Sequence, residues 1–294
     1  MKKIKLKMFF AVILCAALVV LIHGYIHMLS LCAGLGEGYV YSDNMRNIDM
    51  SEYEIEKVFY TDKNQDDLLY IAGLNEGIVR NMVYRKMYAS VCGGQDGEEG
   101  DGVVGEVPVM FKKAVPENVF DEALIVYIKI YGDIRCFPVP KDVGAGVETP
   151  YDDSWNSARD YGGDRKHEGT DIMAANNTRG YFPVVSMTDG VVEKKGWLEL
   201  GGYRLGIRSP GGAYFYYAHL AEYAEGIEEG AQIKAGTVIG TMGDTGYGKE
   251  EGTKGKFDVH LHMGIYCDYN DEEVSFNPYY VLKSADRFKK EFVP

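Results

Sequence analysis

Four of the six histidines in this chain fall between residues 167 and 262, beside a carboxylate that could share a metal ion with them. They stand in three motifs: His167-Glu-Gly-Thr-Asp171, Tyr217-Ala-His219-Leu220 and His260-Leu-His262. The other two, His23 and His27, lie in an apolar N-terminal segment, where they are typical of helix-surface residues. Imidazoles joined by one carboxylate form a ligand set that suits zinc with an open fourth position. We therefore expect a metal site.

The segment around His260 and His262 alternates as a half-buried strand does. Its apolar residues share one face, which would pack into the core: Phe257, Val259, Leu261, Met263 and Ile265. Both histidines then lie on the other face. Since same-face neighbours are about 6.6 Å apart along a strand, both imidazoles can reach one site. A pair of unrelated surface histidines is the alternative interpretation.

His167 and Asp171 need a turn to meet. On a flat strand they would lie about 13 Å apart, too far to share an ion at bond lengths of about 2 Å. Gly169 between them permits the turn. A degenerate H-E-x-x-H helix with Glu168 as the base is disfavoured, because Gly169 opposes a helix and Asp171 replaces the second histidine.

The motifs together resemble the LytM/lysostaphin-type zinc metallopeptidases, which cut the peptides of peptidoglycan. The matching segments extend over about residues 135–283: Asp153-Ser-Trp155, Gly162-Gly163, His167-Glu-Gly-Thr-Asp-Ile172, Gly190-Val-Val192, Tyr217-Ala-His-Leu220, Val238-Ile-Gly240, Gly243-Asp-Thr-Gly246, His260-Leu-His262 and Asn277-Pro278. The resemblance implies an all-β antiparallel domain of the duplicated hybrid motif type. In such a domain two sheets form a groove with the metal on its floor.

The resemblance also implies roles for single residues. His167, Asp171 and His262 would bind Zn²⁺, and His219 and His260 would flank its open side as catalytic histidines. Which of these two is the general base stays open at this point. Zinc would lower the pKa of a bound water to about 7, and the histidines would transfer protons or stabilise the tetrahedral intermediate. Arg165 and Tyr203 are further candidates for substrate contact.

Two other functions are compatible with this fold. Some relatives of these peptidases are non-catalytic scaffolds or regulators of cell-wall, division or sporulation complexes, and they usually lack one of the metal or catalytic residues. This chain has all five of them. A zinc peptidase for proteins or free peptides is the third interpretation. The bond that is cleaved does not follow from the sequence.

Residues 1–36 predict a single-pass membrane anchor. Four lysines precede an uncharged stretch over residues 8–36, which exceeds the roughly 20 apolar residues that a spanning helix needs. Positive charge on this side predicts a cytoplasmic N-terminus and an extracytoplasmic C-terminal domain at the cell membrane. A cleaved signal peptide is the alternative, although no good Ala-x-Ala site follows the apolar run.

The charge distribution restricts the partners. The chain has 31 basic and 44 acidic residues, a net charge of −13. Because the four N-terminal lysines precede the first acid, Glu37, the charge of the remainder is −17. Such a surface argues against nucleic acid as a partner, since phosphate binding needs clustered basic residues. Cys92, Cys136 and Cys267 have no CxxC spacing, which disfavours a disulfide scaffold and thiolate metal sites.

Residues 37–106 predict a mainly helical stalk, which could bind a protein partner or cover the groove. Residues 37–50 look like a polar connector, and residues 51–54 match a helix capping box. Residues 64–91 have helical spacing, whereas residues 92–106 are rich in glycine and acid, as a flexible linker or exposed loop is.

Residues 107–294 predict a β-rich domain around the metallopeptidase core. Short runs of β-forming residues are separated there by Gly, Asp and Asn: residues 123–131, 190–195, 203–208, 213–219 and 257–266. These strands must bring the three histidine motifs to one place.

Overall fold

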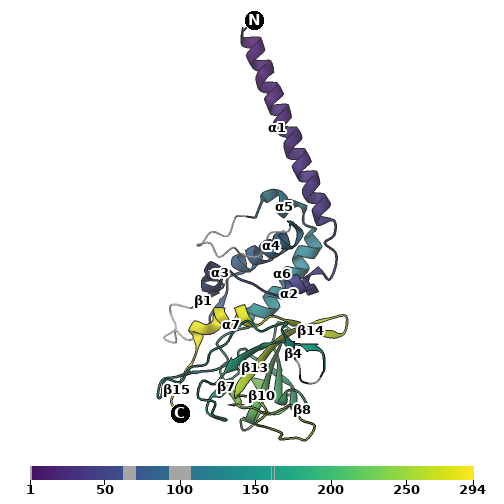
Figure 1. Cartoon of the computed structure of the whole chain (residues 1–294). Helices are drawn as coiled ribbons and strands as arrows, with labels where there is room; N and C mark the ends of the chain where they lie inside the picture. Colours follow the sequence, from purple (N-terminus) through teal and green to yellow (C-terminus); the bar gives the residue numbers. More distant parts are fainter. Residues whose placement is uncertain (1, 62–70, 93–106, 160, 162) are drawn as a thin grey trace.

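The computed structural model describes residues 2–61, 71–92, 107–159, 161 and 163–294. In Figure 1 a long N-terminal helix projects from a group of helices, and these helices sit on one end of a β-domain. The helical elements are α1 (Lys2–Cys32), η1 (Tyr39–Tyr41), α2 (Asp43–Arg46), α3 (Glu52–Lys57), α4 (Glu76–Cys92), α5 (Val109–Ala114), α6 (Glu117–Gly132), α7 (Tyr279–Ala285) and η2 (Asp286–Phe288).

Helix α1 has the length and composition of a membrane span. Among the described residues it is the one helix that passes this test, over Phe10–Cys32, and none of its apolar window is buried in the protein. Its side chains from residue 10 onward are mostly exposed, including Leu14 at 72%. An apolar surface of this kind matches the hydrocarbon of a bilayer. A signal sequence near the N-terminus would pass the same test.

The capping box of the predicted stalk is confirmed. The Ser51 hydroxyl accepts from the backbone N–H of Glu54, and the Glu54 carboxylate accepts from the backbone N–H of Ser51. Two orphan N–H groups at the start of α3 are thereby satisfied. Residues 37–50, in contrast, are more than a polar connector. They form η1 and α2, and Val40, Met45 and Ile48 are fully buried.

The helix expected over residues 64–91 was wrong for residues 71–75. Residues 64–70 lie outside the described residues, and the helix begins only at Glu76. Gly73–Leu74 form strand β2, which pairs with β1 (Phe59–Tyr60). Asn75 ends the extended segment, because its side-chain oxygen accepts from the N–H of Ile78 in the first turn of the helix. The linker expected at 92–106 lies outside the described residues except for Cys92.

The strand expected at residues 123–131 was also wrong, because this run lies inside α6. Its β-branched residues favour a strand locally. The buried positions nevertheless repeat every three or four residues, as one face of a helix does: Val119, Phe120, Ala123, Leu124, Val126, Tyr127, Ile130 and Tyr131. This face packs on α4, where Tyr84 stacks on Phe120 with ring centroids 3.9 Å apart. Tertiary burial overrides the local β preference.

Within the described residues, nine strands form one continuous sheet in which every pairing is antiparallel. The antiparallel β fold expected from the sequence is thereby confirmed, but its main strands form one connected sheet rather than the two expected. Its strands are β6 (Thr170–Met173), β7 (Pro183–Val185), β8 (Gly190–Leu198), β9 (Gly202–Arg208), β10 (Tyr214–Tyr223), β11 (Gln232–Ile233), β12 (Val238–Met242), β13 (His260–Tyr269) and β14 (Glu272–Phe276). Two-stranded pairs are formed by β3 (Lys141–Asp142) with β15 (Glu291–Phe292), and by β4 (Ala158–Arg159) with β5 (Arg165–Lys166).

Strand β10 joins the two halves of this sheet. Its first residues pair with β13 and its last residues pair with β12, while β9 runs along its other edge. The register shifts between Tyr217 and Leu220, where the partner changes. On the core side Phe215, Tyr217 and Leu220 are fully buried. Tyr216 and His219, which lie among them, have ring centroids 5.9 Å and 6.0 Å from that of His262.

A hydrogen bond from the Tyr127 hydroxyl helps to hold α6 in place. The hydroxyl is buried and donates to the carbonyl of Met45 at 2.7 Å, which ties α6 to α2. Tyr127→Phe should cost about 1–3 kcal/mol, because a buried carbonyl loses its partner. The melting temperature should fall by about 2–4 °C for each kcal/mol lost. Tyr53→Phe, at a ring that is 58% exposed, is the control for differential scanning calorimetry. Equal melting temperatures for the two variants would contradict this assignment.

Candidate metal centre

Two of the predicted ligands face each other across paired strands. Asp171 on β6 lies directly opposite His262 on β13, and His260 lies opposite Met173. Leu261, Met263 and Ile265 are fully buried on the core side, as the alternation predicts. His260 and His262 therefore share the opposite face, next to the carboxylate.

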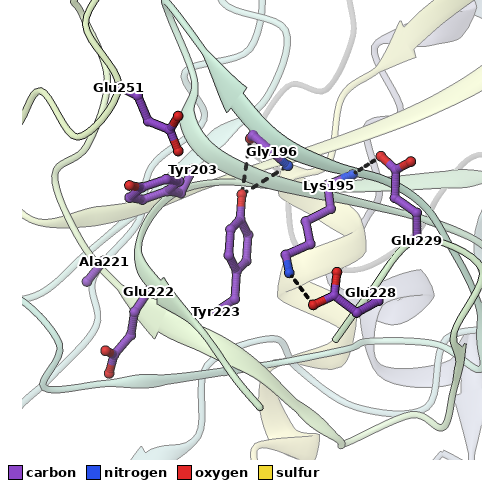
Figure 2. Close-up of a pocket in the computed structure, with 9 residues that line it drawn as sticks. All are labelled: Lys195, Gly196, Tyr203, Ala221, Glu222, Tyr223, Glu228, Glu229 and Glu251. Carbon is purple, nitrogen blue, oxygen red and sulfur yellow. Dashed lines mark hydrogen bonds and ion pairs between the residues drawn. The ribbon is translucent and has the colours of Figure 1, made fainter. Parts of the chain in front are cut away.

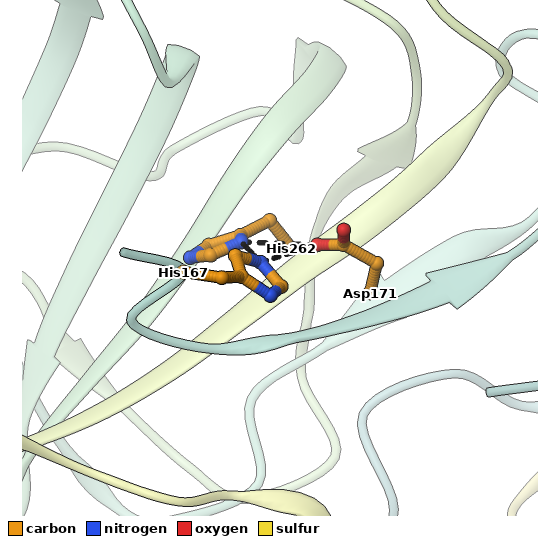
Figure 3. Close-up of side chains that lie close together, drawn as sticks. All are labelled: His167, Asp171 and His262. Carbon is orange, nitrogen blue, oxygen red and sulfur yellow. Dashed lines mark hydrogen bonds and ion pairs between the residues drawn. The ribbon is translucent and has the colours of Figure 1, made fainter. Parts of the chain in front are cut away.

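His167 reaches this pair from the turn between β5 and β6. Its Nε2 atom lies 3.0 Å from Asp171 Oδ1 and 2.8 Å from His262 Nδ1, and His262 Nδ1 lies 3.0 Å from the same oxygen. Figure 3 shows the two rings and the carboxylate converging from the turn and the two strands. Residues separated by 95 positions thus form a triangle of ligand atoms.

The close approach is possible because residue 169 is a glycine. A Cβ there would lie 2.5 Å from the carbonyl oxygen of Met263 and 2.6 Å from Cε1 of His262. Gly169 does not have a positive φ. The turn expected at this position therefore forms, but the glycine is needed for lack of a side chain rather than for backbone freedom.

The donor set fits a zinc ion. Four-coordinate zinc with bonds of about 2.0–2.1 Å places neighbouring ligand atoms roughly 3.3 Å apart, close to the observed triangle. His167 Nδ1 donates to the carbonyl of Ser154 at 3.1 Å, so Nε2 presents its lone pair to the site. Two imidazole nitrogens and one carboxylate oxygen that converge in this way match a cation between them. Three protein ligands also leave one position open.

The second oxygen of Asp171 is held by Arg159. Arg159 Nη2 donates to Asp171 Oδ2 at 2.7 Å, so Oδ1 is the oxygen that faces the two imidazoles. Arg159 was not among the residues singled out in the sequence. It lies on β4, and the hairpin of β4 with β5 brings it back to the carboxylate. Charge compensation of a ligand carboxylate is common in metal sites, but no spacing rule identifies which arginine supplies it.

The two remaining histidines lie beside the triangle. His219 Nδ1 donates to the carbonyl of Thr245 at 2.7 Å, and His260 Nδ1 donates to the carbonyl of Asp258 at 2.7 Å. Their ring centroids are 4.7 Å apart, and His260 Nε2 is 3.8 Å from Asp171 Oδ1. In both rings the Nδ1 hydrogen is engaged, so Nε2 is the atom left for chemistry.

His219 owes its position to the irregularity in β10. Its backbone φ is +61°, a left-handed conformation that residues other than glycine rarely adopt. Its N–H donates to the carbonyl of Gly201. Such strain costs about 1–3 kcal/mol and is found most often at functional sites. The extra residue in the strand turns the ring of His219 toward His260.

The electrostatics of the cluster depend on its burial. Burial, followed by the neighbouring His260 and His262, lowers the pKa of His219 well below its usual value of 6.5. Burial also lowers the pKa of His262. For Asp171 burial alone would raise the pKa, but its contacts with the ring nitrogens of His167 and His262 outweigh burial and leave the pKa below its usual value. These directions favour the carboxylate anion of Asp171 and the neutral imidazole of His262, which are the forms that bind metal.

Aromatic residues form one wall of the site. Phe257 packs against both His219 and His260, with ring centroids 4.6 Å and 5.0 Å from theirs. Tyr247 packs on Phe257 at 4.7 Å, and the Arg165 guanidinium donates to its hydroxyl at 3.1 Å. Arg165, one of the two residues considered for substrate contact, is therefore tied to this wall.

Tyr203, the other such residue, lines a hollow of about 850 Å³ that contains none of the five predicted site residues. Figure 2 shows Tyr203 and Tyr223 standing among Lys195 and four carboxylates, with Lys195 paired to Glu228. The Tyr203 N–H donates to the hydroxyl of Thr245, whose carbonyl holds His219. The hollow and the histidines therefore share Thr245 as a common support.

Known proteins are similar to this chain in sequence and in fold. Residues 165–278 match the family described as Peptidase family M23. A crystal structure from Ruminococcus gnavus, provisionally named as a glycyl-glycine endopeptidase LytM, is 41% identical with a TM-score of 0.69, over 88% of this chain and 96% of its own. The chain belongs to peptidase family M23. Because the overlap covers 88% of the chain, it extends beyond the β-domain of this M23 protein into the helices.

Two curated relatives match part of this M23 protein. The L-Ala–D-Glu endopeptidase of Bacillus subtilis is 44% identical over 165 residues, which are 55% of this chain and 48% of that protein. Lysostaphin of Staphylococcus simulans is 29% identical over 121 residues, 40% of this chain and 22% of its own. The chain thus spans about half or less of the length of these relatives. The LytM/lysostaphin resemblance stated from the motifs is confirmed.

Replacing Arg159 should loosen Asp171. In Arg159→Ala the carboxylate loses the partner of Oδ2 and can rotate away from the triangle. Zinc affinity should fall by about 10–100-fold, the usual effect of removing a residue that orients a ligand. Competition against a chromogenic chelator measures this change. Arg165→Ala removes a nearby guanidinium that contacts Tyr247 instead, and it should keep wild-type affinity. A loss of equal size in both variants would contradict the role of Arg159.

Adding one methyl group at residue 169 should separate the ligands. In Gly169→Ala the new Cβ collides with the ring of His262 and the backbone of Met263. Overpacking should cost about 1–3 kcal/mol of stability. Isothermal titration should show zinc binding lost. At Gly132 the same Cβ would meet only Ile128 at 3.8 Å, so Gly132→Ala is the control. Normal zinc binding by Gly169→Ala would show that the turn has room to adjust.

Proposed function

We propose that this protein is a membrane-anchored zinc endopeptidase that hydrolyses peptide bonds in peptidoglycan. The observation that carries the proposal is the convergence of His167 Nε2, Asp171 Oδ1 and His262 Nδ1 within 3.0 Å of one another, with His219 and His260 beside them. Membership of peptidase family M23 supports hydrolysis of peptides in the cell wall.

The proposed chemistry divides the site between ligands and proton carriers. A zinc ion on the three ligands would lower the pKa of a bound water to about 7 and polarise the carbonyl of a peptide bond. His260 and His219 would accept and return protons through Nε2, since backbone carbonyls hold both Nδ1 hydrogens. Because burial lowers the pKa of His219, its Nε2 is unprotonated at neutral pH and its lone pair can accept a hydrogen bond from a water or the substrate. Arg159 would keep Asp171 oriented throughout.

The wider organisation belongs to the same proposal. Residues 1–36 would anchor the chain through α1 with a cytoplasmic N-terminus, which leaves the peptidase outside the membrane. We place the start of the β-rich domain near residue 133, later than the 107 expected from the sequence, because α5 and α6 are helical. The metallopeptidase core expected at about residues 135–283 lies within these bounds. The helical region comprises residues 37–61, 71–92 and 107–132.

The names of the relatives reduce the number of candidate bonds that the enzyme would cut. The two proteins above 40% identity have names that specify an L-Ala–D-Glu bond and a glycyl-glycine bond. Stem peptides and glycyl bridges are therefore the first substrates to test. A zinc peptidase for free proteins would cleave neither in preference to casein.

Digestion of purified cell walls by the full chain in detergent tests the function. We expect peptide release that stops on zinc chelation and returns when zinc is added, with the cleaved bond identified by mass spectrometry of defined fragments. His262→Ala should lose zinc and activity together. His260→Ala should keep zinc and lose at least about 100-fold in turnover, the contribution expected of a general acid–base group.

If no peptide is released from walls that contain the stem peptide or from walls that contain glycyl bridges, despite stoichiometric zinc, the proposed enzymatic activity is refuted. A scaffold with the same fold would then be favoured. Full activity of His260→Ala would refute the role given to that histidine alone.

A further inference from the structure

The end of α2 contacts the β-domain close to the metal centre. Arg46 Nη1 donates to the carbonyl of Ser275 on β14 at 3.1 Å, and its guanidinium lies over the ring of Trp155, 5.4 Å from the centroid. Trp155 Nε1 in turn donates to the hydroxyl of Ser275 at 3.4 Å. A cation over an indole ring is attractive by about 0.5–2 kcal/mol. Arg46 therefore holds Trp155 against the sheet.

The next residue, Asn47, is linked through the buried amide of Asn277 to Asp153, which lies in the same loop as Trp155. Asn277 Nδ2 donates to Asn47 Oδ1 at 2.8 Å and to Asp153 Oδ1 at 3.0 Å, and the Asn277 N–H donates to the Arg46 carbonyl at 2.9 Å. Asn277 is 1% exposed. Buried hydrogen bonds of this kind are costly to break, because the separated groups cannot reach water. The loop of residues 153–157 is thus attached to the helical region at both Asp153 and Trp155.

This loop is also the one that orients His167. The Ser154 carbonyl accepts from His167 Nδ1 at 3.1 Å. On the backbone, the Asn156 N–H donates to the His167 carbonyl at 2.7 Å, and the His167 N–H donates to the Ser157 carbonyl at 2.8 Å. The side chain of His167 is almost completely buried. Its ring therefore has the direction that the loop imposes.

We propose that Arg46 and Asn47 are positioning residues for the metal ligand His167, so that the helical region is part of the support of the metal centre. The contacts run from Arg46 to Trp155 and from Asn47 through Asn277 to Asp153, and Ser154 between these two anchors holds His167. The identity of the ion as zinc rests on the proposed function. The positioning itself concerns only residues of this chain.

The consequence is a metal affinity that depends on the helical region. A ligand whose supporting residues are free to move must lose more entropy when it binds the ion. Loss of either anchor lets the Ser154 carbonyl move and leaves His167 less well oriented. Removing contacts that orient a ligand typically weakens metal binding by about 10–100-fold.

Zinc affinity of the full chain in detergent tests the inference, by competition with a chromogenic chelator. Arg46→Ala and Asn47→Ala should each bind zinc about tenfold more weakly, at the lower end of the range for orienting residues. Arg80→Ala is the matched control. Arg80 also lies in the helical region with its guanidinium over an aromatic ring, 5.2 Å from the centroid of Phe120, but its partner is not on the loop. This variant should keep wild-type affinity.

Cobalt substitution supplies a readout that a general loss of stability would not change. The visible d–d absorption of bound Co²⁺ reports ligand geometry, and it should shift in Arg46→Ala but not in Arg80→Ala. Arg46→Lys keeps a cation near Trp155 and should recover part of the affinity. If Arg46→Ala fails to fold, Asn47→Ala decides the question by itself.

Unchanged zinc affinity in Arg46→Ala and Asn47→Ala, or an equal loss in Arg80→Ala, would overturn the inference. Both metal readouts are independent of wall digestion. Inactivity of the wild-type chain on walls would therefore refute the proposed function and leave the positioning test valid.

Discussion

Asp171 and His262 lie directly opposite each other on the antiparallel strands β6 and β13, and the candidate metal centre depends on this pairing. It sets one carboxylate oxygen 3.0 Å from an imidazole nitrogen. A shift of one residue in the register would move every side chain of β6 to the other face and separate the ligands. The buried residues on the core side of β13 prevent such a shift. The same apolar packing that stabilises the sheet therefore keeps the ligands together.

Around this pair, each remaining group is held by a hydrogen bond that also determines its chemistry. Backbone carbonyls accept from Nδ1 of His167, His219 and His260, and leave Nε2 of each ring available. Arg159 occupies the second oxygen of Asp171. Because the rings cannot turn without losing a buried hydrogen bond, the site is organised in advance. Preorganisation of this kind lowers the cost of reaching the transition state.

The helical region and the β-domain are connected by polar contacts as well as by apolar packing. Tyr41 stacks on Tyr269 with ring centroids 4.1 Å apart, and the contacts of Arg46 and Asn47 lie beside this stack. Tyr127 ties α6 to the same segment through Met45. Movement of the helical region relative to the sheet would therefore disturb the loop of residues 153–157. The helical region is therefore more than a spacer, because its contacts with this loop connect it to His167.

The sequence by itself determined the features that depend on residues close together along the chain. A period of two places His260 and His262 on one face, the Ser51 capping box starts α3, and the apolar N-terminal run forms α1. The set of ligand types, and their match to a known family, could also be read directly.

Tertiary structure decided the rest. Residues 123–131 are helical because α4 covers one face of them, His219 is aimed by a shift in β10, and Arg159 and Arg46 meet their partners only after the chain has folded. Local spacing specifies which side chains share a face. It does not specify which distant segments pack together, because that depends on burial and topology summed over the whole chain.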